Sequence, residues 1–99
     1  MTTNQKTQHF SLCIPRVLQT ITERQIHKIF DELQLGIIHK IDIRKGDKEF
    51  NRAFVHFRKW SSSDNAAIAK ERFNNGMDIK VIYDGTWFWK VMPFKARTQ

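Results

Sequence analysis

The chain has 99 residues, 40% of them hydrophobic and 12% aromatic, which suits one folded domain and excludes the composition of a disordered tail. Its 17 Lys and Arg against 10 Asp and Glu leave a formal net charge of +7, which favours a polyanionic partner such as nucleic acid. Cys13 is the only cysteine, which excludes an internal disulfide, and no apolar run approaches the roughly 18 residues of a membrane span.

The N-terminal residues 1–8 are polar and lack the apolar segment of a signal peptide, so we expect a flexible tail there. The lone cysteine fits a reducing compartment. Together these features predict an intracellular protein of the nucleus or cytoplasm that is not secreted and has no membrane partner. A folded domain is expected over residues 9–95, with a second short tail over residues 96–99.

The first strand and the first helix have distinct local signals. Large apolar residues alternate with Ser and Cys over residues 10–14, and Pro15, which has no backbone N–H, is expected to end this strand. Thr22 and Gln25 form a capping-box pattern that predicts a helix start, and Gly36 is expected to close the helix. The apolar residues between them recur at helical spacing: Ile26, Ile29, Phe30 and Leu33.

The middle of the chain predicts two more strands and a second helix. Ile41 and Ile43 belong to a second strand, which Gly46 interrupts. Residues 52–57 alternate in apolar character and predict a third strand. Helix-capping residues follow at 61–64, and the helix after them is expected to end at Asn75-Gly76.

The C-terminal part predicts a hairpin, because strand-like residues 79–83 and 86–92 flank Asp84-Gly85. The full order is strand, helix, strand, strand, helix and strand, which is the ferredoxin-like split βαβ arrangement of the α+β class. We expect a four-stranded antiparallel sheet with two helices on one face and a long terminal hairpin. The other face of the sheet is expected to be open.

Strand alternation divides the strand residues between the two faces of this sheet. The inward residues are expected to be Phe10, Leu12, Ile14, Ile41, Ile43, Ala53, Val55, Phe57, Trp87, Trp89 and Val91, with both tryptophans in the core under the second helix. The open face is expected to carry Ser11, Cys13, Lys40, Asp42, Arg44, Arg52, Phe54, His56, Phe88, Lys90 and Met92.

Two strand segments resemble the conserved motifs of one family. Residues 12–17 (Leu-Cys-Ile-Pro-Arg-Val) are similar to the hexamer of the RNA recognition motif, and residues 50–57 are similar to its octamer. The resemblance extends from about Phe10 to Lys95, and there is a fainter similarity to single-domain members encoded by large DNA viruses. It implies a module that binds single-stranded RNA on the open face by stacking bases on aromatic side chains.

The chain departs from the family pattern at the stacking positions. Cys13 and Arg52 occupy two positions that are normally aromatic, Asn51 replaces a glycine, and only Phe54 keeps its ring. Each stacked base contributes about 1–3 kcal/mol, so the two missing rings would cost about 2–6 kcal/mol of binding free energy. An arginine plane also stacks on bases and recovers part of this loss. We therefore expect moderate, salt-sensitive binding with low sequence specificity, to RNA or single-stranded DNA.

The expected contacts follow from this pattern. Phe54 stacks a base, while Arg52, His56 and Phe88 stack or pair nearby. No catalytic residue, metal ligand or cofactor is expected, because the four histidines lack metal-ligand spacing and no glycine-rich phosphate loop is present. Four basic residues are expected to contact phosphates: Lys40, Arg44, Lys48 and Lys90.

A second interpretation stays open, in which the same fold serves protein interaction or homodimerisation without binding RNA. The missing aromatic residues motivate it. In this interpretation Phe54 is covered by a second protein, or by the chain's own segment over residues 93–99. Peptide capture through an Arg-x-Phe loop motif is disfavoured, because the loop over residues 74–78 has no such motif.

Overall fold

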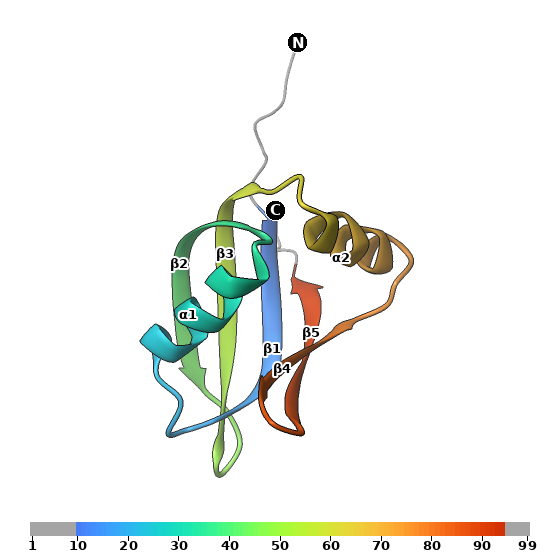
Figure 1. Cartoon of the computed structure of the whole chain (residues 1–99). Coiled ribbons are helices and arrows are strands. Elements are labelled where there is room, and N and C mark those ends of the chain that lie inside the picture. Colours follow the sequence, from blue (N-terminus) through green and yellow to red (C-terminus); the bar gives the residue numbers. More distant parts are fainter. Residues whose placement is uncertain (1–9, 95–99) are drawn as a thin grey trace, which may run out of the picture.

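A computed structural model describes residues 10–94 and shows an α+β arrangement, with two helices packed on one face of an antiparallel sheet (Figure 1). The expected tails over residues 1–8 and 96–99 lie outside the described residues. The elements in chain order are β1 (Phe10–Leu18), α1 (Glu23–Leu33), β2 (Gly36–Lys45), β3 (Phe50–Trp60), α2 (Asp64–Asn74), β4 (Ile79–Asp84) and β5 (Trp87–Phe94).

The sheet has five strands in the order β2-β3-β1-β5-β4, so the expectation of four strands was wrong. The difference arises at the terminal hairpin, because both of its arms join the sheet. The end of β5 over residues 92–94 pairs with β1, while its earlier residues pair with β4. The last strand is therefore the neighbour of β1, and β4 becomes the edge strand.

Strand β1 continues beyond Pro15 to Leu18, so the expectation that Pro15 ends the strand was also wrong. Its pairing with β3 is regular up to Ile14 opposite Ala53 and resumes only at Val17 opposite Asn51. Pro15 and Arg16 of β1 thus face only Arg52 of β3, which is a β-bulge. A bulge accommodates proline inside a strand, because the extra residue does not need a ladder hydrogen bond.

The cap of α1 is confirmed at its start and differs at its end. The backbone N–H of Gln25 donates to Thr22 Oγ1 at 3.2 Å, and the backbone N–H of Thr22 donates to Gln25 Oε1 at 2.8 Å. At the C-terminus, Gln34 takes the left-handed conformation with φ of 57°, and Gly36 already belongs to β2. The sequence thus placed the end of the helix about two residues late.

Helix α2 begins and ends where its sequence indicates. The hydroxyl of Ser63 accepts a hydrogen bond from the backbone N–H of Ala66 at 3.1 Å, which caps the first turn. After α2, Asn75 is the C-cap, and Gly76 takes a left-handed conformation with φ of 76°.

One hydrophobic core lies between the sheet and both helices. Phe30 of α1 is fully buried, and its ring lies 6.5 Å from that of Phe57 and 6.4 Å from that of Trp89, measured between centroids. Trp89 is 3% exposed and also stacks on Tyr83. Trp87 is 64% exposed, so its assignment to the core was wrong. Its strand position has the inward parity, but it lies next to the hairpin turn, beyond the covered part of the sheet.

Gly36 is needed because β2 and β3 approach closely at their paired ends. A Cβ at this position would overlap the backbone carbonyl oxygen of Lys59. We expect Gly36→Ala to lower the free energy of unfolding by about 1–3 kcal/mol, measured by urea denaturation, since one strand must shift to admit the methyl group. Gly85→Asn is the control: Gly85 has φ of 57°, no heavy atom of the described residues lies within 4 Å of an added Cβ, and asparagine tolerates this conformation. Equal denaturation midpoints for Gly36→Ala and the parent would contradict this account.

Candidate nucleic-acid interface

The sheet face opposite the helices, which we call the open face, carries a central aromatic contact. The rings of Phe54 on β3 and Phe94 on β5 lie 4.8 Å apart between centroids, at an interplanar angle of 53°. We call these two residues the ring pair. Phe54 is half-buried, and Phe94 is 38% exposed. The pair thus leaves aromatic surface accessible at the middle of the sheet.

The ring pair depends on small residues in the strand between its members. β3 and β5 both neighbour β1, so their backbones are about 9.5 Å apart. In this region β1 contributes only Ser11 and Cys13 to the open face, and Cys13 lies opposite Phe54 in the register. The two phenylalanine side chains therefore meet across β1. Phe94 thus supplies a ring near Cys13 from another strand.

The sequence predicts Phe54 as the one retained stacking ring, and the structure adds to this the ring of Phe94, which packs against it. Of the segment over residues 93–99, which was considered as a cover for Phe54, Phe94 covers the ring in part, and residues 95–99 lie outside the described residues. Phe94 was missed as a site residue because it falls in neither the hexamer nor the octamer. Continuing the alternation of Phe88, Lys90 and Met92 by one step would have placed it on the open face.

A polar ladder crosses three strands beside the ring pair. Nδ1 of His56 on β3 forms a hydrogen bond with the hydroxyl of Ser11 on β1 at 2.7 Å. Its Nε2 donates to Oδ2 of Asp42 on β2 at 3.1 Å. Since the carboxylate requires an N–H at Nε2, a neutral imidazole accepts from Ser11 at Nδ1. The ladder therefore holds His56 in place, with both ring nitrogens engaged.

The order of Ser11, His56 and Asp42 resembles that of a hydrolase triad. Acyl transfer also requires N–H donors aimed at a developing oxyanion. Around Ser11 the backbone is committed to pairing, because β1 is paired with both β3 and β5 there. We interpret the ladder as a set of hydrogen bonds that fixes side chains of the open face.

Basic side chains oppose one another on both sides of the ring pair. Arg44 on β2 pairs in register with Arg52 on β3, and Lys80 on β4 pairs with Lys90 on β5. All four are exposed. Within residues 10–94, the two ion pairs shorter than 4.0 Å both use Asp42, with Lys40 and His56 as partners. The four cations, which we call the like-charge pairs, take part in neither of these ion pairs, and the two members of each pair repel one another.

Seven of the eight expected site residues lie on the strands of the open face: Lys40, Arg44, Arg52, Phe54, His56, Phe88 and Lys90. Lys48 instead lies in the turn between β2 and β3, where it takes a left-handed conformation with φ of 41°. Phe88 is 44% exposed, and the ammonium of Lys80 lies 4.8 Å from its ring centroid. Lys80 was not predicted as a site residue, because it lies in β4, outside the two strand segments that resemble the hexamer and the octamer.

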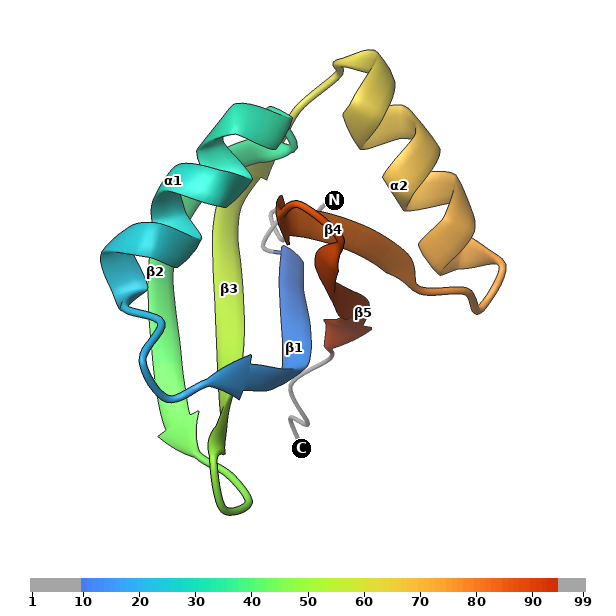
Figure 2. The same ribbon diagram turned by 60° about the horizontal axis from the view of Figure 1, so that its bottom comes forward.

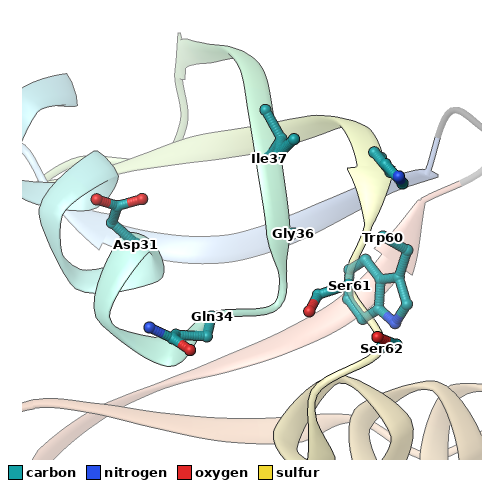
Figure 3. Close-up of a pocket in the computed structure, with 8 residues that line it drawn as sticks. Asp31, Gln34, Gly36, Ile37, Trp60, Ser61 and Ser62 are labelled. Atoms are coloured by element: carbon teal, nitrogen blue, oxygen red, sulfur yellow. The ribbon is translucent and has the colours of Figure 1, made fainter.

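A separate hollow of about 470 Å³ opens on the helix side, where α1 ends and β2 begins. Figure 3 shows Asp31 and Gln34 on one side of it, and Trp60 with two serines on the other. The indole N–H of Trp60 donates to the backbone carbonyl of Ala66 at 3.0 Å, and the backbone N–H of Ser61 donates to the backbone carbonyl of Leu35 at 2.8 Å. These groups connect the ends of elements, so we interpret this hollow as structural.

No protein-family model, curated protein or solved structure matches this chain. Within the described residues, no group of three His, Cys, Asp or Glu side chains is placed to hold a metal ion. In the same part of the chain, neither helix is long and apolar enough to cross a membrane. Functional interpretation therefore depends on the geometry of the open face.

Burial raises the pKa of the Cys13 thiol, and the nearby Arg52 opposes this in part. We expect iodoacetamide to alkylate Cys13 more slowly in the folded protein than in the urea-unfolded chain at pH 8, as measured by mass spectrometry. Because the folded pKa exceeds the unfolded one, its contribution to stability is present below the ordinary thiol pKa and is lost as pH rises through the folded value. Cys13→Ser should remove this alkaline loss. Equal alkylation rates in both states would contradict the burial.

Proposed function

We propose that the chain is a single-stranded RNA-binding module that uses the open face of its sheet. The fold is then a ferredoxin-like split βαβ of the RNA recognition motif type, in which β5 takes the place of the fourth strand and β4 is an added edge. One observation carries the proposal: the ring pair lies between two like-charge pairs that have no acidic partner within residues 10–94. An RNA strand supplies both flat bases for the ring pair and anions for these four cations.

Stacking and phosphate contacts divide between different side chains in this proposal. A base stacks on the accessible surface of the ring pair, and Arg52 lies next to Phe54 in position to add a guanidinium plane. Phosphates next to the stacked base contact Arg44 and Lys40, and Lys48 approaches from its turn. Lys90 lies four residues from Phe94 on β5 and contacts the phosphate of a more distant nucleotide. Because neither kind of contact reads base edges, binding has low sequence specificity. Paired bases cannot reach the rings, so duplexes bind more weakly.

Homodimerisation through the open face is the second candidate. Exposed apolar side chains favour it, since Phe88, Met92 and Phe94 are 44%, 37% and 38% exposed. Electrostatics disfavours it, because two copies placed face to face bring together eight arginines and lysines from their like-charge pairs. A polyanion faces no such repulsion, and RNA is therefore the better-supported ligand. Sedimentation of the protein alone separates the two candidates.

The ring pair is tested by Phe54→Ala and Phe94→Ala. Each should weaken binding to labelled poly(U) by about 5- to 150-fold, because a stacked base contributes about 1–3 kcal/mol. Fluorescence anisotropy measures this, and thermal denaturation shows that each variant is folded. Trp87→Ala is the matched control, since Trp87 is 64% exposed but alternates with Phe88 and so lies off the open face. Parent-like affinity of both folded Phe variants would remove the central contact.

The like-charge pairs are tested by salt dependence. Contact with four or five phosphates predicts a slope of about −3 in a plot of log affinity against log salt concentration, at about −0.7 per phosphate. Arg44→Gln combined with Arg52→Gln should make the slope less negative by about 1.4. Titration at several salt concentrations provides the measurement. A slope near zero for the parent would contradict phosphate binding on this face.

A further inference from the structure

We propose that a hollow between β1 and β5 is a second nucleotide subsite, which binds one nucleotide of the same RNA strand by its phosphate and its base. The hollow has a volume of about 460 Å³, within the range of ligand pockets. Its lining residues are Pro15, Arg16, Phe88, Trp89, Lys90 and Met92, and we call it the β1–β5 hollow. This inference rests on the proposed function and adds a site to it.

The hollow exists because β1 and β5 separate. They pair only where Ser11 to Cys13 face Phe94 to Met92. Beyond that point Pro15 has no N–H to continue the ladder, and the bulge in β1 bends the strand. Figure 2 shows the end of β1 turning toward the β2 side of the sheet. The first half of β5 instead follows β4, so the two strands leave an opening between them.

Within residues 10–94, the lining combines cations with apolar surface and contains no carboxylate. Arg16 and Lys90 line it, and the guanidinium of Arg16 lies 5.1 Å from the ring centroid of Phe50. Lys80 brings a third positive charge, as the register partner of Lys90 and 4.8 Å from the Phe88 ring centroid. Phe88, Pro15 and Met92 supply the apolar surface. A ligand that is both anionic and flat matches this set, which is the chemistry of a nucleotide.

The hollow and the ring pair lie along one strand. Phe88 and Phe94 are six residues apart on β5, which spans about 20 Å, and Met92 lies on the same face between them. An RNA strand that stacks on the ring pair can therefore continue along β5 to the hollow. An acidic peptide offers the charge but not the flat rings, so RNA is the occupant that both the ring pair and the β1–β5 hollow favour.

The test compares a uridine trinucleotide with a decanucleotide, because only the longer oligonucleotide reaches from the ring pair to the hollow. Arg16→Gln combined with Lys90→Gln should lower the affinity for the decanucleotide at least about tenfold and make the salt slope of its binding less negative by about 1.4. Trinucleotide affinity should stay near that of the parent. The matched control is Arg24→Gln combined with Lys28→Gln, which removes the same charge from exposed positions on α1, on the other side of the sheet.

A second pair of variants tests the base contact without changing charge. Phe88→Ala should lower the affinity for the decanucleotide but not for the trinucleotide, whereas Ile82→Ala should lower the affinity for neither. Ile82 is 67% exposed and is the register partner of Phe88 on the same hairpin. Thermal denaturation identifies any variant that fails to fold, and Lys90→Gln alone then replaces the double variant.

Four outcomes would overturn the subsite. The first two are a loss of decanucleotide affinity in the α1 control as large as in the hollow variants, and an equal loss of affinity for both oligonucleotide lengths. The other two are parent-like decanucleotide binding by all hollow variants, and displacement of the decanucleotide by poly-glutamate as effective as displacement by unlabelled RNA. If Phe54→Ala still weakens the decanucleotide in these cases, the proposed function stands without the subsite. If the parent protein binds neither oligonucleotide, the proposed function itself fails.

Discussion

The structure depends on β1, which lies between β3 and β5 and joins the two parts of the sheet. On the helix side Leu12, Ile14 and Val17 are fully buried, so this strand anchors the core. On the other side Ser11 and Cys13 are small. The same strand therefore holds the sheet together by hydrophobic burial and leaves space over which side chains of its neighbours meet.

The open face combines features that are unfavourable for the protein alone. Arginine faces arginine on one side of the ring pair, and lysine faces lysine on the other. Such repulsion lowers stability, and the buried cluster on the helix side offsets it. A bound polyanion would convert the repulsion into attraction, which is the physical basis for proposing RNA rather than a second copy of the chain as the ligand of this face.

Sequence reasoning located most of the candidate site but not its organisation. Alternation along β2 and β3 correctly placed Lys40, Arg44, Arg52 and Phe54 on strand positions of one face, because side-chain direction in a regular strand has a period of two. It did not find Phe94, because contact across an intervening strand depends on how small the residues of that strand are. It also missed Arg16, whose position depends on a bulge that shifts the alternation.

The sequence by itself determined the α+β class, the approximate strand and helix segments, the cap at Thr22, a set of candidate caps over residues 61–64, and the hairpin turn. These features depend on periodicity and on hydrogen bonds between near neighbours in the chain. Only the tertiary structure decided that the sheet has five strands and that Trp89 is buried while Trp87 is exposed. Both tryptophans have the same strand parity, but burial depends on what covers each position, and that covering comes from residues far away in the sequence.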